Sequence, residues 1–302
     1  MCCWRKTAPW PQRSSPSTDV TENTKVVIET VRAADHDRYL SVLYAPENKR
    51  GALFSLYAFN AEVAGIRDRI HEALPGEVRL QWWRDVIAAE EDRAKVGHPV
   101  ADALRTTISA HRLPKAAFDN MLEARIFDLY DDLMPSRTDL EGYCGETAAA
   151  LIQLAAMVLD PGEAPRFAEL AGRAGCAQAM TGLLLLLPLH RKRGQCFVPA
   201  DILAAAGSSP QEFVTGDGGP GAERAVAAMI ALAREHLSAF EQGASALPVS
   251  LRPAFLPLAL SSAYLDRIEN ARRSPLKDAV RLSAMRRHWL LFRHATQGWP
   301  AV

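Results

Sequence analysis

The sequence predicts an all-α protein, and three observations lead to that fold class. Alanine, leucine, glutamate and arginine, which all favour helices, dominate the chain. Apolar residues recur at spacings of three and four, the period of a helix with one buried face. No run of alternating β-branched residues suggests a strand. We therefore expect a helical bundle.

Proline and glycine set the expected limits of the helices, because neither residue continues a helix well. From the N-terminus, the breaks fall at Pro46, Pro75-Gly76, Gly97-His98-Pro99, Pro114, Pro135-Ser136, Pro161-Gly162, Gly207 to Pro210, Gly216 to Gly221, Pro248 and Ser274-Pro275. Between the later breaks, Val226 to Phe240 is expected to form an amphipathic helix. Arg286 to Arg293 mixes arginine with tryptophan, which suits either an interfacial helix at a membrane or partner protein, or a helix that closes the bundle.

The N-terminal residues 1–22 differ from the rest of the chain. They are rich in proline, serine and arginine and contain no apolar core of a secretory signal. We expect a disordered tail, with a weak organelle presequence as the alternative. Residues 23–302 are expected to form a single helical domain.

Composition narrows the possible partners and the compartment. Lysine plus arginine and aspartate plus glutamate both number 35, so no overall charge favours nucleic acid. The five cysteines have no metal-site spacing, and we expect reduced thiols, with Cys144 and Cys176 packed in the core. The longest apolar stretches, Ala148 to Leu159 and Leu183 to Leu189, fall short of the ~20 residues that span a bilayer. We expect a cytoplasmic protein, with a peripheral position at the inner membrane left open.

Several blocks of sequence resemble the squalene/phytoene synthase family. They occur in the family's order at residues 57–68, 75–85, 143–150 and 175–199, and the resemblance spans roughly residues 35 to 295. The resemblance implies an isoprenoid-synthase-type helical bundle around a central cavity.

The chain departs from that family where its catalytic members carry paired aspartates. Residues four apart share one helix face, so an Asp-x-x-x-Asp pair aims two carboxylates at one Mg²⁺ that holds a diphosphate. The corresponding positions here are Ala64 with Asp68, and Leu186 with His190. The chain therefore resembles a degenerate branch of the family that is associated with assembly of mitochondrial respiratory complex I.

The resemblance also supplies candidate site residues, each with a structural alternative. Asp68, Glu62 and Glu146 are the remnant acids that could still serve catalysis. The candidates for binding a prenyl or lipid ligand are Tyr143, Arg79, Gln81, Trp83, Arg84, His190, Arg191 and Arg193. The alternatives are an architectural salt bridge for the charged residues, core packing for one indole of Trp82-Trp83, and a solvated helix end for His190 to Arg193.

Two functions of different class follow. The first is a non-catalytic protein without metal or cofactor, which binds a prenyl or lipid ligand and assists a membrane or respiratory-complex protein. The second is a Mg-dependent head-to-head prenyltransferase that makes a phytoene or squalene type of product. The first is the favoured hypothesis.

Overall fold

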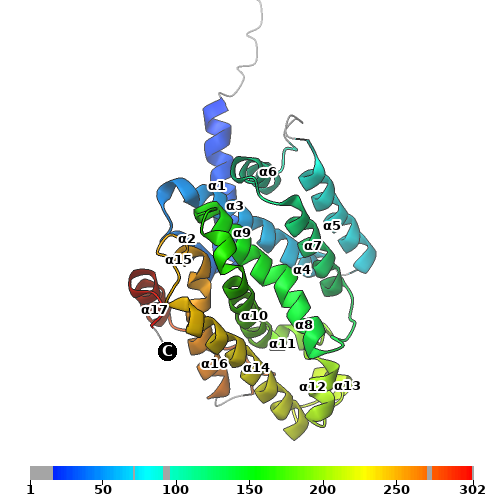
Figure 1. The fold of residues 1–302 in the computed structure, drawn as a ribbon. Coiled ribbons are helices and arrows are strands. Elements are labelled where there is room, and N and C mark those ends of the chain that lie inside the picture. Colours follow the sequence, from blue (N-terminus) through cyan, green and yellow to red (C-terminus); the bar gives the residue numbers. More distant parts are fainter. Residues whose placement is uncertain (1–15, 71, 91–95, 271–273, 301–302) are drawn as a thin grey trace, which may run out of the picture.

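The computed structural model describes residues 16–70, 72–90, 96–270 and 274–300, and within these ranges it contains helices and no strand. Figure 1 shows the helices gathered around α10, with α1 rising from one end of the body. The all-α prediction is confirmed.

The N-terminal half supplies α1 to α7. These helices span Pro16–Ala34 (α1), His36–Val42 (α2), Glu47–Ala64 (α3), Ile66–Arg69 (α4), Ala73–Ala88 (α5), Pro99–His111 (α6) and Lys115–Ala124 (α7), and the 3-10 turn η1 follows at Arg125–Leu129. Because α1 begins at Pro16, residues 16–22 belong to a helix rather than to the expected tail. Residues 1–15 lie outside the described residues, so the tail prediction stays untested for them.

The middle of the chain supplies the central helices. They span Arg137–Cys144 (α8), Gly145–Ala149 (η2, a π-helical turn), Ala150–Leu159 (α9), Ala164–Phe167 (η3), Ala168–Leu185 (α10) and Leu187–Lys192 (α11). The C-terminal part adds Ala200–Ala205 (α12), Pro210–Thr215 (α13), Pro220–Ala244 (α14), Arg252–Phe255 (α15), Leu256–Leu260 (η4), Ser261–Glu269 (α16) and Ala284–Gln297 (α17). The expected helix from Val226 to Phe240 lies inside α14 and is confirmed.

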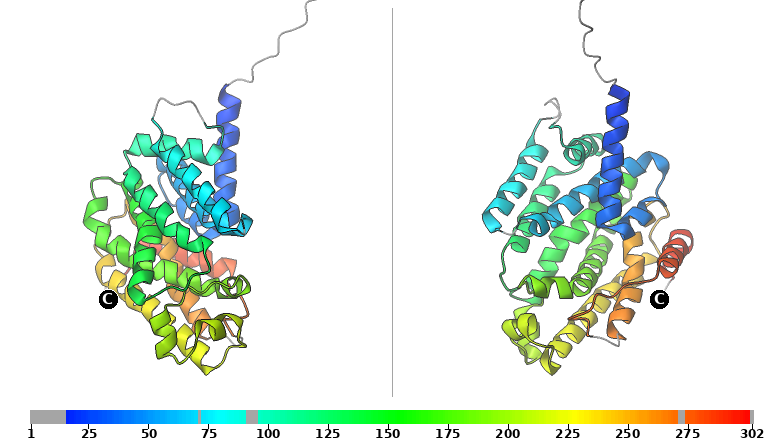
Figure 2. Two further views of the ribbon diagram at one scale, coloured as in Figure 1. Left: turned by 90° about the vertical axis from the view of Figure 1, so that its right-hand side faces the viewer. Right: turned by 180° about the vertical axis from the view of Figure 1, so that it is seen from behind.

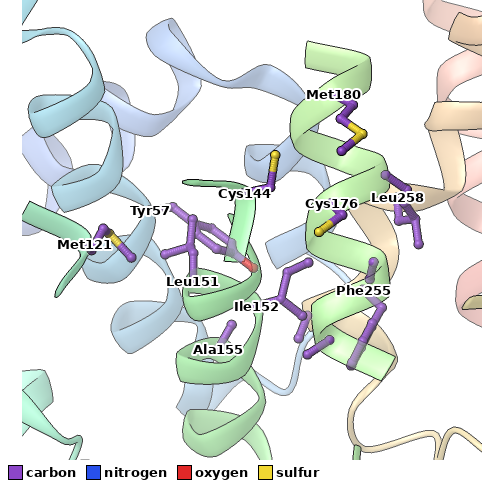
Figure 3. Close-up of a cluster of buried hydrophobic side chains, with 14 of the residues drawn as sticks. Tyr57, Met121, Cys144, Leu151, Ile152, Ala155, Cys176, Met180, Phe255 and Leu258 are labelled. Carbon is purple, nitrogen blue, oxygen red and sulfur yellow. The ribbon is translucent and has the colours of Figure 1, made fainter. Parts of the chain in front are cut away.

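Helix α10 forms the centre of the core. It packs along α14 and against α8, η2, α9 and α16. Figure 3 shows Cys144 and Cys176 among the buried side chains at this contact. Both cysteines are buried free thiols, which confirms their expected place in the core. The right-hand view in Figure 2 shows the C-terminal helix α17 on the outside of the body.

Helix α10 approaches η2 very closely at Gly175. A Cβ atom added to this glycine would lie 2.4 Å from the Cα and Cβ atoms of Ala149, at the end of the π-helical turn η2. Real Cβ atoms do not approach other atoms so closely, so only glycine fits here.

The structure contains one continuous helical run that is longer than any apolar stretch expected from the sequence. Arg137–Leu159, which joins α8, η2 and α9, is long and apolar enough to cross a membrane, and 56% of its apolar window is buried inside the structure. From the sequence we expected only Ala148 to Leu159 as an apolar stretch, which is too short to span a bilayer. The run is longer because the π-helical turn η2 joins α8 to α9 without a break. A core helix meets the same criterion, and this run packs against α3 and α10.

Candidate functional site

A pocket of about 720 Å³ lies between the N-terminal helices and α10. Its wall is formed by residues of α2, α3, α4, η1, α8, η2, α10, α11, η4 and α16. Apolar side chains such as Leu183 and Phe197 line it together with charged ones. The pocket therefore suits a ligand with an apolar body and a polar end.

The structure brings both expected motif regions to this pocket. Ala64, Asp68, Leu186 and His190 all line the wall. Helix α3 ends at Ala64 and turns through Gly65 into α4, while α10 ends at Leu185 and turns into α11. The two motif regions, more than a hundred residues apart in the sequence, therefore face the same cavity.

Asp68 is joined across the pocket to Arg193. The Oδ1 atom of Asp68 lies 2.5 Å from an Nη atom of Arg193, which directly follows α11. The Asp68 side chain is 52% exposed and that of Arg193 27%. A guanidinium group therefore neutralises the carboxylate that remains from the first motif.

A second polar cluster lies deeper in the wall and centres on Arg125. Its Nη1 atom donates to Asp128 Oδ2 and to Tyr143 Oη, each at 2.8 Å, and its Nη2 donates to Asn60 Oδ1 at 3.4 Å. Tyr143 in turn donates to Asp128 Oδ1 at 2.8 Å, and Gln195 donates to the Asp128 carbonyl at 2.9 Å. Burial raises the pKa of Tyr143 well above its ordinary value, so Tyr143 stays neutral.

The arginine itself remains charged. Burial on its own lowers the pKa of Arg125, but the hydrogen bonds that it donates to Tyr143 and Asp128, together with the negative charge of Asp128, raise the pKa above its ordinary value. Arg125 and Asp128 form a partly buried ion pair, with side chains 15% and 13% exposed.

A third cluster joins the pocket wall to the C-terminal helix α17. Tyr264 donates to Asp37 Oδ2 at 3.0 Å, and Arg287 of α17 donates to Tyr264 Oη at 3.3 Å. The Nε atom of Arg287 also lies 2.8 Å from Asp37 Oδ1, an ion pair whose angle falls outside hydrogen-bond geometry. Burial raises the pKa of Asp37 above its ordinary value, and the positive charge of Arg287 offsets only part of this increase.

Each arginine on the described pocket wall has a carboxylate partner. The pairs are Arg38 with Asp35, Arg67 with Asp131 at 2.9 Å, Arg69 with Glu62 at 3.1 Å, Arg125 with Asp128 at 2.8 Å, and Arg193 with Asp68 at 2.5 Å. An anionic ligand would have to compete with these partners for the guanidinium groups.

His190 is the buried member of the second motif region. The residue is 7% exposed, and its ring centroid lies 4.7 Å from that of Phe197. Burial, followed by the charge of Arg193, lowers the pKa of His190 to about 4. His190 is therefore neutral at pH 7.

This shift predicts that acid weakens the fold through His190. The ordinary pKa is 6.5 and the folded value about 4, so between these pH values the unfolded chain binds more protons. The stabilising effect is complete above pH ~6.5 and is lost as the pH falls, by about 2 kcal/mol from pH 7 to pH 5. In urea unfolding at both pH values, His190→Gln should lose less stability than the wild type by that amount. His288→Gln, at an exposed histidine, is the control and should behave as the wild type; equal losses in all three proteins would contradict the assignment.

Four of the expected ligand-binding residues lie on α5, away from the pocket wall. The indole of Trp83 is buried and packs edge-on against Phe59 at 5.2 Å between centroids. The guanidinium of Arg79 stacks over Trp82 at 4.1 Å. Arg84 pairs with Asp119 at 3.0 Å and with Glu123, and Gln81 donates to Asp85 at 2.9 Å. Core packing for one indole is thus confirmed, and Trp83 and Arg84 join α5 to α3 and α7.

The other expected residues divide between the pocket and its surroundings. Tyr143, His190 and Arg193 line the pocket, as does Asp68, whereas Glu62, Glu146 and Arg191 do not. Arg191 donates to the carbonyls of Phe213 at 2.8 Å and Leu276 at 3.0 Å, so this part of the basic cluster is not a solvated helix end.

The sequence reasoning missed the acids and arginines that form the deeper clusters. Arg125 and Asp128 carried one available signal, since residues three apart on an apolar helical segment lie close enough to pair. The contact between Arg38 and Gln178, at 3.2 Å, joins residues 140 apart and has no local signal.

The residues that the structure describes include no group of three or more histidine, cysteine, aspartate or glutamate side chains that could hold a metal ion. The side chains of Ala64 and Leu186, at two of the four motif positions, offer no oxygen or nitrogen ligand.

Comparison with known proteins agrees with the geometry. The family described as squalene/phytoene synthase matches residues 31–288. The chain is 28% identical to the Bos taurus NADH dehydrogenase (ubiquinone) complex I, assembly factor 6, over 80% of this chain and 72% of that protein. It is 25% identical to the 15-cis-phytoene synthase of Synechococcus elongatus, over 76% of this chain and 79% of the relative. A crystal structure of a dehydrosqualene synthase in complex with ligand superposes with a TM-score of 0.78, at 17% identity, over 92% of this chain and 97% of that one. The expected helical fold is confirmed.

Proposed function

Because this chain belongs to the squalene/phytoene synthase family, we propose that it is a member without prenyltransferase activity, which binds a prenyl or lipid ligand and serves the assembly of a respiratory complex. The observation that carries the proposal is the chemistry of the four motif positions. Two of them are hydrocarbon, one is a neutral buried histidine, and the single carboxylate, Asp68, is held by Arg193.

This donor set does not fit a Mg²⁺–diphosphate site. Magnesium prefers octahedral oxygen ligands, usually from one or two carboxylates together with substrate phosphates and water. A bound metal ion supplies several kcal/mol of charge stabilisation when a diphosphate leaves, and each 1.36 kcal/mol corresponds to a factor of ten in rate. The proposed role therefore uses the pocket for binding alone.

The assembly role is supported by similarity. The relative from Bos taurus is named as an assembly factor of NADH dehydrogenase complex I, and the match covers most of both chains. We propose a respiratory-complex protein as the partner and a cytoplasmic, peripheral location at the inner membrane.

A Mg-dependent prenyltransferase is the second candidate. It is favoured by the similarity to 15-cis-phytoene synthase and by the four aspartates on the pocket wall: Asp35, Asp37, Asp68 and Asp128. In that case Asp68 would have to leave Arg193 in order to hold the metal.

A turnover assay separates the two candidates. The full chain is incubated with radiolabelled farnesyl or geranylgeranyl diphosphate and Mg²⁺ or Mn²⁺, and extracted lipids and released pyrophosphate are measured. We expect neither product nor pyrophosphate above the level without protein, while the Synechococcus phytoene synthase serves as the positive control. Product formation that Asp68→Ala abolishes would overturn the proposal in favour of the prenyltransferase.

Complementation tests the assembly role with the same residue. Cells that lack this chain should contain less assembled NADH dehydrogenase complex, and the wild-type chain should restore it. Asp68→Asn, which keeps the shape and removes the charge, should restore the complex equally well because no catalysis is required. A normal amount of complex in the deletion cells would contradict the assembly role.

A further inference from the structure

The C-terminal helix α17 carries a row of large apolar side chains on its outer face. Met285, Trp289 and Phe292 are 82%, 55% and 58% exposed. Their spacing of four and three places them on one side of the helix. Leu291, on the opposite side, is fully buried against the body. The helix thus closes the bundle with one face and leaves an apolar face uncovered.

The charged residues of the segment that carries this row have a single sign. The chain contains no aspartate or glutamate after Asp278, whereas Arg281, Arg286, Arg287 and Arg293 all lie in this segment. Arg281, Arg286 and Arg293 are exposed, and the guanidinium of Arg293 stacks over the Trp289 ring at 5.5 Å. An arginine beside tryptophan and phenylalanine can keep its charge at lipid head groups while the rings enter the bilayer.

The helix is also held firmly enough to present this face. Ser283 caps its first turn through a hydrogen bond from the Arg286 amide at 3.3 Å. At the other end, Arg252 donates to the Thr296 carbonyl at 3.0 Å. Its inner face is joined to Asp37 and Tyr264 on the pocket wall through Arg287. The apolar row is therefore already helical and oriented before any partner arrives, which lowers the entropic cost of docking.

We propose that the outer face of α17, formed by Met285, Trp289, Phe292, Arg286 and Arg293, docks the protein on an anionic phospholipid surface. An anionic bilayer is the occupant that matches both properties of this face, because it accepts aromatic rings at the depth of its head groups and attracts arginine. The docking does not depend on whether the pocket catalyses a reaction.

Vesicle binding tests the surface. The full chain should co-sediment with vesicles that contain phosphatidylglycerol far better than with vesicles of phosphatidylcholine alone, and added salt should weaken the binding. The double variant Arg286→Ser/Arg293→Ser should lower the partition coefficient on anionic vesicles by about fivefold per arginine. The double variant Trp289→Ser/Phe292→Ser should lower it by about tenfold or more.

A matched control uses a second exposed apolar pair. Leu74 and Val78 lie on one side of α5 and are 73% and 70% exposed. Leu74→Ser/Val78→Ser should leave vesicle binding unchanged, and circular dichroism should show the same helix content in all variants. Failure of the wild-type chain to bind anionic vesicles, or an equal loss in the α5 control, would overturn the proposal. Self-association that disappears with Trp289→Ser/Phe292→Ser while vesicle binding persists would also overturn it, in favour of a second copy as the occupant.

Discussion

Replacing Gly175 by alanine is expected to destabilise the fold by about 2 kcal/mol, although replacing a helical glycine by alanine usually stabilises a protein. Alanine favours a helix over glycine by about 1 kcal/mol. At Gly175 the added methyl group would meet the backbone of Ala149 at 2.4 Å, so α10 and the π-helical turn η2 must separate. That separation disturbs the packing of α10 against α8 and α9 in the core.

Gly172, one turn earlier on α10, provides the matched control. A Cβ atom there would meet nothing within 4 Å. Gly172→Ala should therefore raise the free energy of unfolding by about 0.5–1 kcal/mol. Urea unfolding of both variants gives the comparison. If the two substitutions shifted stability in the same direction, the close approach of α10 to Ala149 would be wrong.

Arg125→Met is expected to cost about 2 kcal/mol of folding free energy, because it leaves a partly buried carboxylate without its cation. Asp128 is 13% exposed and would keep the Tyr143 hydroxyl as a donor but lose the guanidinium. Methionine replaces most of the arginine's apolar volume, so the loss reports the charge rather than a cavity.

Two further variants separate the buried charge from other effects. Arg84→Met removes an arginine whose partners, Asp119 and Glu123, are 65% and 71% exposed, so it should cost less than about 1 kcal/mol. The double variant Arg125→Met/Asp128→Leu removes both buried charges and should recover much of the loss. Urea unfolding measures all of them, and a cost for Arg125→Met no larger than for Arg84→Met would contradict a buried ion pair.

The fold could be predicted from the sequence because its signals are local and repeated. Helical periodicity and composition gave the fold class, and the prolines marked real helix starts: Pro46 caps α3, Pro99 opens α6 and Pro220 opens α14. Pro75-Gly76 was expected to be a break, but it lies in the first turns of α5 because proline is tolerated near a helix start. There Gly76 packs directly against Leu129.

The candidate site could be predicted only in part. The family resemblance implied that Ala64, Asp68, Leu186 and His190 line one cavity, and all four line the pocket. The expected single helix face for each pair is not seen, because the helices break within both motifs, at Gly65 and at Leu186. Spacing does not say which way a whole helix is turned. Helix α5 turns Trp83 into the core and Arg84 towards α7, so its expected ligand-binding residues lie away from the pocket.

Ion pairs between residues that are distant in the sequence also could not be predicted. The pairing of Asp68 with Arg193, and of Asp37 with Arg287, depends on how distant helices cross. Local patterns carry no information on such crossings, because tertiary packing decides them.

The contact of Arg287 with Asp37 and Tyr264 has a thermodynamic consequence. The guanidinium group of Arg287, on α17, contacts the pocket wall, and the same helix carries the exposed apolar row on its outer face. A displacement of α17 therefore reaches the cavity directly, without any intervening domain movement. Such coupling is reciprocal. If a ligand in the pocket shifts Asp37 and so changes the affinity of the outer face of α17 for its partner surface, docking of that face changes the affinity of the pocket for the ligand by the same factor.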